Sequence, residues 1–184
     1  MKKKETKIFR LFTPVVIILL ISGLVGCDFF FPKPKRVDFV GDRFSITKPA
    51  RWKIMNNLNE DADLQMANPA KEAYTVVFSE GIKEMAEFGI FSRDKYAEYT
   101  VGMILNNLEQ SQLYPAENLE GGIHNGVKHK ITGTLKGLNF IYWHITIETP
   151  EYYNQIVVWS LDSHFKQNES DFNTVINSFD TNYE

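Results

Sequence analysis

The stretch VKHKITGTL, residues 127–135, alternates apolar and polar side chains and decides how the chain folds. Lys136-Gly137 supplies a turn, and residues 140–148 return with a second alternating pattern. Strict alternation over such lengths is typical of half-buried strands, and the short turn predicts an antiparallel hairpin. The aliphatic face of the returning strand carries Ile141, Trp143, Ile145 and Ile147.

The other face of that strand carries Phe140, Tyr142 and His144, which we take as a possible ligand-binding face. A third strand is expected over residues 153–161, and it is apolar on both sides. A strand that is apolar on both sides has to be covered on both sides. The sequence therefore predicts a sheet with helices against each face.

Segments upstream and downstream complete this sheet. Strands are expected over residues 43–47, 63–67 and 73–82, and a helix over 93–110 with Ser92 as its N-terminal cap. A last helix, capped by Asn168 or Ser170, carries an apolar stripe that ends at Phe179. The order of strands, helix, meander and helix predicts an α+β fold with an antiparallel sheet of about six strands.

No recognisable catalytic motif is present. The sequence has no dinucleotide-binding, phosphate-binding or serine-nucleophile signature. His129 and His144 can meet across the hairpin and bind a metal, but packed histidines are far commoner. Residues 57–63 have the alternate oxygen spacing of a calcium loop without its glycine or closing glutamate, which favours a solvated turn. Glu80, Glu84 and Glu87 are interpreted as an exposed acidic surface. We therefore expect no catalytic residue, metal or cofactor.

The beginning of the chain predicts a secretory leader. Residues 1–10 hold five basic side chains and one acidic side chain, and a mostly apolar run over 11–25 follows. This run is short for a bilayer span and fits a signal peptide, although an uncleaved anchor helix is the alternative. Leu24-Val25-Gly26-Cys27 resembles the lipobox of bacterial lipoproteins.

That resemblance implies three parts: a signal peptide over 1–26, a lipidated N-terminus and linker over 27–42, and a globular domain over 43–184. It also implies acylation of Cys27, with diacylglycerol on its sulfur and an acyl group such as palmitate on its amine. Cys27 is the chain's single cysteine, so no internal disulfide is possible. More than one acyl chain gives stable attachment to a bilayer.

The residues after Cys27 bear on its location. Asp28 resembles the signal that retains lipoproteins in the inner membrane of bacteria that have two membranes. We expect a lipid-anchored protein that faces the periplasm, or the outside if the source has a single membrane. The linker continues with Phe29, Phe30, Phe31, Lys33, Lys35 and Arg36. The phenylalanines either enter the membrane boundary, with the cations over anionic headgroups, or pack on the domain.

Charge excludes one class of partner. Without residues 1–26 the chain carries 15 Lys and Arg against 22 Asp and Glu, a net charge of −7. Nucleic-acid binding requires a basic patch, so we expect no nucleic-acid partner.

The domain resembles the PsbP-like and DcrB-like family. The resemblance rests on residues 44–52, with Pro49 and Trp52 after a strand, on the aromatic hairpin over 142–161, and on the closing segment 172–179. It implies an α/β/α sandwich and a protein without a catalytic site. Family members support photosystem II, bind a small GTPase, or serve as envelope lipoproteins linked to membrane homeostasis.

The lipobox favours the last of these roles. We therefore expect a non-enzymatic envelope lipoprotein that binds or stabilises a membrane-protein partner. The alternatives are a small-ligand-binding lipoprotein that uses an aromatic pocket and, least favoured, an enzyme. Fold alone does not choose among them.

Overall fold

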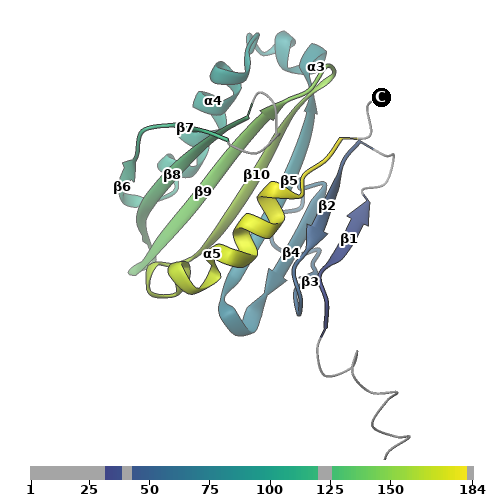
Figure 1. Ribbon diagram of the computed structural model, residues 1–184. Helices are drawn as coiled ribbons and strands as arrows, with labels where there is room; N and C mark the ends of the chain where they lie inside the picture. The colour runs from purple at the N-terminus through teal and green to yellow at the C-terminus, as the bar shows by residue number, and fades with distance from the viewer. Residues whose placement is uncertain (1–31, 39–42, 120–125, 182–184) are drawn as a thin grey trace, which may run out of the picture. The chain divides into compact units, whose positions relative to one another are not determined.

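An antiparallel sheet forms the centre of the domain, with α4 (Arg93–Asn106) on one face and α5 (Asp162–Asn177) on the other (Figure 1). The computed structural model describes residues 32–38, 43–119 and 126–181. The chain divides into two units, Met1–Lys33 and Pro34–Glu184, and the described helices and strands lie in the second.

The large sheet has eight strands among the described residues. Their spatial order is β3 (Lys53–Ile54), β4 (Leu64–Asn68), β5 (Ala73–Gly81), β10 (Tyr152–Leu161), β9 (Leu138–Glu148), β8 (Gly126–Leu135) and β6 (Glu109–Leu113), and β7 (Glu117–Asn118) also pairs with β8. β3 and β7 have two residues each, so six longer strands remain, in agreement with the expected number. Five of them are predicted strands, but the predicted strand over 43–47 lies outside this sheet, and the sixth is β6, where the sequence predicts the end of a helix and a loop. β1 (Lys35–Asp38) and β2 (Ser45–Lys48) form a separate antiparallel pair.

The hairpin predicted over residues 127–148 is confirmed. β8 and β9 pair from Gly126 opposite Ile147 to Leu135 opposite Leu138, and Lys136 and Gly137 make the turn. Both turn residues have positive φ, which glycine adopts without steric cost and which suits a two-residue hairpin turn. β10 then pairs with β9 on one side and β5 on the other.

The helices are partly as predicted. Ser92 caps α4, because its hydroxyl accepts a hydrogen bond from the Lys95 N–H at 3.3 Å. α4 ends at Asn106, not at 110, because residues 109–113 form β6. A short helix α3 (Ile82–Glu87) and a 3₁₀ turn η1 (Pro69–Lys71) are additional.

The predicted start of the last helix is wrong. α5 begins at Asp162, directly after β10, and neither Asn168 nor Ser170 caps it. Its N-terminal residue Leu161 makes no capping hydrogen bond, so the local signal is missing. Asn168 is instead buried within the helix, where its amide donates to the Lys71 carbonyl at 3.0 Å.

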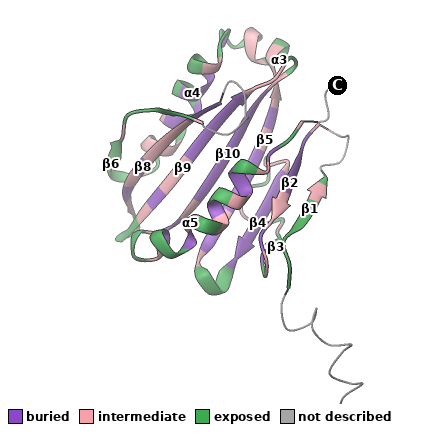
Figure 2. Cartoon of the chain, in the orientation of Figure 1, coloured by how far each residue is buried: buried purple, intermediate pink, exposed green. Residues whose placement is uncertain are grey.

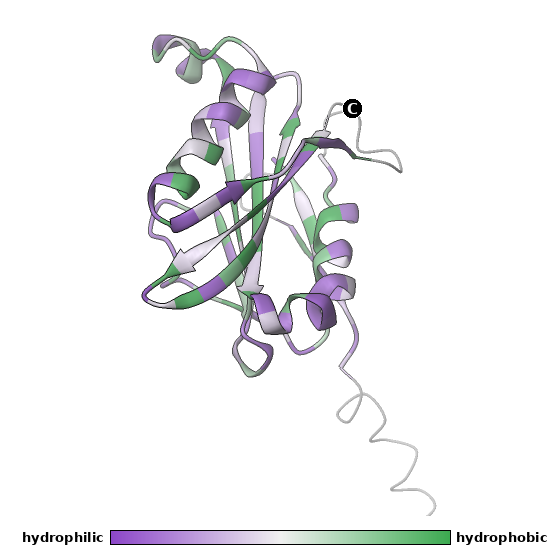
Figure 3. Cartoon of the chain, turned by 90° about the vertical axis from the view of Figure 1, so that its left-hand side faces the viewer, coloured by the Kyte–Doolittle hydropathy of each residue, from purple (hydrophilic) through white to green (hydrophobic). Residues whose placement is uncertain are grey.

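The main core lies between the sheet and α5 (Figure 2). Phe165, Phe172, Val175 and Ile176 of α5 are buried against residues of β4, β5, β9 and β10. Trp52 closes one end of this core, because its ring meets Phe172 edge-on and its Nε1 donates to Asp171 at 3.0 Å. The 90° view shows the sheet between its two helices (Figure 3), which confirms the expected cover on both faces.

Candidate functional site

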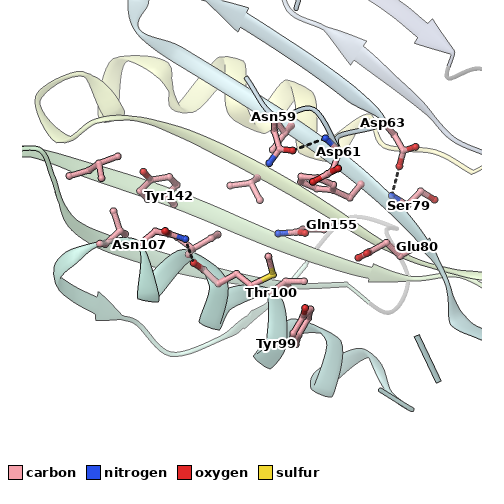
Figure 4. A pocket seen from close by; sticks show the side chains of 17 residues that line it. Asn59, Asp61, Asp63, Ser79, Glu80, Tyr99, Thr100, Asn107, Tyr142 and Gln155 are labelled. Carbon is pink, nitrogen blue, oxygen red and sulfur yellow. Dashed lines mark hydrogen bonds between the residues drawn. The ribbon is translucent and has the colours of Figure 1, made fainter. Parts of the chain in front are cut away.

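A groove lies on the α4 side of the sheet, between α4 and the loop over residues 59–63 (Figure 4). It has a volume of about 690 Å³, within the range of small-molecule sites. Its two walls, the loop over 59–63 and α4, come from distant parts of the sequence. Strands β5, β9 and β10 form its floor. The lining side chains include Asn59, Asp61, Asp63, Val76, Phe78, Glu80, Tyr99, Thr100, Met103, Ile104, Asn107, Leu108, Leu135, Tyr142, Gln155 and Val157.

Strand register arranges the floor in rows. Gln155 of β10 lies opposite Phe78 of β5, and Val157 lies opposite Val76 in the next row. Because alternate residues of a strand point to the same face, these side chains share the α4 side. The floor therefore changes from polar at the Glu80 end to apolar towards Tyr142 (Figure 4).

A buried hydrogen-bonded set fixes α4 beside the groove. Tyr96 is fully buried, stacks on Tyr153 with ring centroids 5.0 Å apart, and donates its hydroxyl to Glu80. Burial, together with the nearby Glu80 carboxylate, raises the pKa of Tyr96 well above its ordinary value. One turn further on, the Thr100 hydroxyl donates to the Tyr96 carbonyl at 2.9 Å and lies 2.9 Å from His144 Nε2.

His144 belongs to this support and not to the open groove. It is fully buried, and because the Thr100 hydroxyl already donates to Tyr96, His144 Nε2 is assigned as the donor to Thr100. Its Nδ1 has no hydrogen-bond partner among the described residues. Burial, followed by repulsion from His129, lowers the pKa of His144 to about 3, so the imidazole is neutral.

The 59–63 wall is held by a buried glutamine. Gln65 of β4 accepts backbone N–H groups from Leu58 at 2.7 Å and Asn59 at 3.2 Å, and its amide donates to the Asn59 carbonyl at 2.6 Å. Asn59 in turn accepts the Asp61 N–H at 2.9 Å. The turn is solvated, as the sequence predicts, since Asn57, Asn59 and Asp61 are exposed, and the Gln65 side chain fixes its backbone.

The polar end of the groove is acidic. Asp63 accepts the Ser79 N–H at 2.7 Å and lies 4.0 Å from the Arg43 guanidinium. The sequence predicts an exposed Glu80, but this residue of β5 is half-buried. Its carboxylate accepts a hydrogen bond from the Tyr96 hydroxyl. Within the described residues, no group of three or more histidine, cysteine or acidic side chains could hold a metal ion.

Gln155 occupies the middle of the floor. It is only 8% exposed and lies between the acidic end and the apolar end (Figure 4). Its side-chain amide has no hydrogen bond to any residue in the described part of the chain. Sequence reasoning missed it, although a polar Asn154-Gln155 pair inside an otherwise apolar strand is a detectable signal.

The three residues predicted as a ligand face have different surroundings. Tyr142 lines the groove, His144 is buried under α4, and Phe140 lies next to Tyr142 with ring centroids 6.1 Å apart, outside the groove lining. Tyr142 also stacks on Trp159, which stacks on Tyr74, so an aromatic row crosses three strands beyond the groove. Burial raises the pKa of Tyr142.

The two strand histidines do meet across the hairpin. His129 of β8 is the register partner of His144 of β9, and their ring centroids are 6.1 Å apart. Burial lowers the pKa of His129 as well. His144 Nε2 is engaged by Thr100, and among the described residues no further histidine, cysteine or acidic side chain joins the pair to form a metal-binding group of three.

The predicted membrane-proximal residues lie mostly outside the described part of the chain. Cys27, Asp28 and the three phenylalanines, Phe29, Phe30 and Phe31, are not described. Lys33 is exposed, and Lys35 and Arg36 lie in β1, where Arg36 donates to Asp38 at 2.9 Å. None of the described helices is long and apolar enough to cross a membrane.

Comparisons with known proteins identify the fold. No protein-family model matches the sequence, and no curated protein matches it either. Among solved structures, the Ran-binding protein Mog1p of Saccharomyces cerevisiae matches with a TM-score of 0.56 and 9% identity, over 81% of this chain and 95% of Mog1p. The cyanobacterial PsbP protein CyanoP of Synechocystis matches with a TM-score of 0.56 and 12% identity, over 81% of this chain and 92% of CyanoP.

A third similar structure comes from Mycobacterium tuberculosis. LpqN, described as involved in cell envelope biogenesis, matches with a TM-score of 0.56 and 14% identity, over 80% of this chain and 89% of LpqN. At these identities the likeness concerns the fold alone. The domain therefore has the α+β fold shared by Mog1 and the PsbP-like proteins, as the resemblance in sequence implies.

Proposed function

We propose that the mature protein is a lipid-anchored, non-enzymatic component of the bacterial cell envelope that binds a membrane-protein partner. The observation that carries this proposal is the lipobox Leu24–Cys27 directly ahead of a domain with this fold. Support comes from LpqN, a similar structure whose description places it in envelope biogenesis, and from Mog1p, a protein of this fold that binds a protein.

The structure offers a surface for such a partner. Phe88 and Phe91, in the turn between α3 and α4, are 76% and 75% exposed, and Tyr99 and Met103 on α4 are 55% and 53% exposed. Gly89 and Ile90 of the turn share one hollow with Tyr99 and Met103, so the turn that carries Phe88 and Phe91 adjoins this part of α4. Exposed apolar groups that gather in this way mark interaction sites.

The anchoring is tested by metabolic labelling. Cells that express the protein and are fed an alkyne fatty acid should label it, and Cys27→Ser should abolish both the label and the removal of residues 1–26. Labelling that persists in Cys27→Ser would contradict acylation at this residue.

The partner surface is tested by photo-crosslinking in intact membranes. A photoreactive phenylalanine at Met103 should give a defined adduct, and the same group at Gln167, exposed on α5 across the sheet, should not. Equal adducts from both positions, or none from Met103, would contradict a partner on the α4 side.

A second function is favoured by the groove itself. A concave site of about 690 Å³ that joins a polar end to an apolar floor has the properties of a small-ligand site. This protein would then be a ligand-binding lipoprotein. The two functions are compatible, because Tyr99 and Met103 belong both to the exposed surface and to the groove wall.

A further inference from the structure

We infer that the groove binds a small amphipathic cation, an amine or guanidine attached to an apolar body, because acidic side chains and the groove-facing amide of Gln155 adjoin an apolar floor. This inference rests on the ligand-binding function proposed above. It names the chemical class of ligand, which neither the fold nor the similar structures indicate.

The charged side chains that line the groove favour a positively charged ligand. Asp61, Asp63 and Glu80 line one end, and no described lysine, arginine or histidine lines the groove. Arg43 lies beside Asp63 at 4.0 Å and offsets one of these three charges. Glu80 accepts one hydrogen bond, from Tyr96, and the Asp61 side chain is exposed. A carboxylate has about four lone-pair sites, so acceptor capacity remains for a cation.

Gln155 gives independent evidence of a ligand. Its side chain is more than nine-tenths buried and is directed into the groove next to the acidic end (Figure 4). It makes no hydrogen bond with the described part of the chain. Its amide atoms are accessible from the groove, so they can bind a polar group of a ligand there. The amide oxygen can accept an N–H of an ammonium or guanidinium group that also contacts Glu80.

The remaining floor sets the shape of the ligand. Val76 and Val157 form the next row, followed by Tyr142, and Met103 and Leu135 add apolar walls. Glu80 and Val76 are four residues apart on β5, which corresponds to about 13 Å along an extended strand. An apolar body of roughly that length would lie on the floor while its cationic head reaches Gln155 and Glu80.

The test uses three probes with one body and different heads: 4-phenylbutylamine, 4-phenylbutanol and 4-phenylbutyrate. The full lipidated protein is placed in nanodiscs of uncharged lipid, and each probe is titrated calorimetrically with empty nanodiscs as the blank. The amine should bind at least about tenfold more tightly than the alcohol, and the acid should bind most weakly.

Variants locate this binding. Gln155→Leu and Glu80→Gln should each weaken the amine at least about tenfold, and Glu80→Gln should leave the alcohol unchanged, since glutamine keeps an acceptor for Tyr96. Gln167→Leu, an exposed glutamine on the opposite side of the sheet, is the matched control and should bind the amine as the wild type does.

Two results would overturn the inference. Equal affinities for the three probes would show a groove without preference for cations, although a ligand site would remain. No binding of any probe would remove the ligand-binding function too. Acylation of Cys27 and crosslinking at Met103 are separate measurements, so the envelope function would still be judged on its own.

Discussion

At the scale of single residues, His144 connects burial to pH. The structure places its neutral ring between the sheet and α4, 2.9 Å from the Thr100 hydroxyl, and its pKa falls from 6.5 to about 3. The unfolded chain therefore binds a proton at this residue between pH 6.5 and 3, where the folded chain does not. The free energy of unfolding that neutral His144 contributes is fully present above pH 6.5 and is lost as the pH falls towards 3.

We expect His144→Gln to remove this dependence. Each pH unit below 6.5 costs the wild type about 1.4 kcal/mol, so it should lose about 2 kcal/mol more than the variant between pH 7 and pH 5. Urea unfolding of both proteins at the two pH values measures the difference. The variant is expected to be less stable at pH 7, because a well-packed ring is replaced, but the test depends only on the change with pH. Stabilities that fall in parallel would contradict the assignment.

At the same scale, sequence alone could place some side chains and not others. Alternation along β9 put Tyr142 and His144 on the face opposite Ile145, and this is what the structure shows. Alternation does not say where a helix will cross that face. His144 lies under α4, where it is buried and contacts Thr100. Tyr142 lies beside α4 and lines the groove. Gln155 was missed because its environment depends on β5 and β9 together.

At the scale of elements, local signals decided which boundaries could be predicted. Ser92 caps α4 through its own hydroxyl, a pattern visible in four consecutive residues. α5 has no such cap, since β10 leads straight into it at Leu161, and its start depends on Phe165 docking against Trp143 with ring centroids 5.0 Å apart. That contact joins residues from different elements, so a local interpretation started the helix too late.

One wall of the groove, the loop over residues 59–63, is held by the Gln65 side chain. Gln65→Leu should make this loop more mobile, because three hydrogen bonds to the Leu58 and Asn59 backbone are lost together. The stability loss should be about 1–3 kcal/mol, the usual cost of leaving such backbone groups without a partner. Hydrogen exchange at the Leu58 and Asn59 amides should accelerate while the Tyr96 amide of α4 is unaffected.

Gln112→Leu on the edge strand β6 is the matched control. It is exposed and far from the loop in the sheet order, so its substitution should change stability by less than about 0.5 kcal/mol. Unchanged exchange at Leu58 in Gln65→Leu would show that the loop is held by other contacts.

At the scale of the whole molecule, the proposed attachment of the domain to the membrane can be separated from folding. The boundary between the two units falls between Lys33 and Pro34, whereas β1 begins at Lys35 and pairs with β2. β1 contributes to stability, since Val37 packs against the core and Arg36 lies 3.6 Å from Asp180. The sequence placed all of residues 27–42 in a linker, because a four-residue strand flanked by prolines and charges has almost no pattern of its own.

An insertion of 20 glycine and serine residues between Lys33 and Pro34 should therefore leave the thermal midpoint within about 2 °C of the wild type, a shift of at most about 1 kcal/mol for a domain of this size. Such a linker has a mean reach of roughly 25 Å, which would let the domain move away from the bilayer. If proximity to the membrane is part of the function, crosslinking from Met103 to the membrane partner should fall even though folding and acylation persist.

Val37→Ala is the control, because it should cost about 1 kcal/mol in unfolding experiments and so shows that the measurement detects β1 contacts. A large drop in the midpoint on insertion would mean that residues before Pro34 help to stabilise the domain, and undiminished crosslinking would mean that the partner reaches the domain without a short tether.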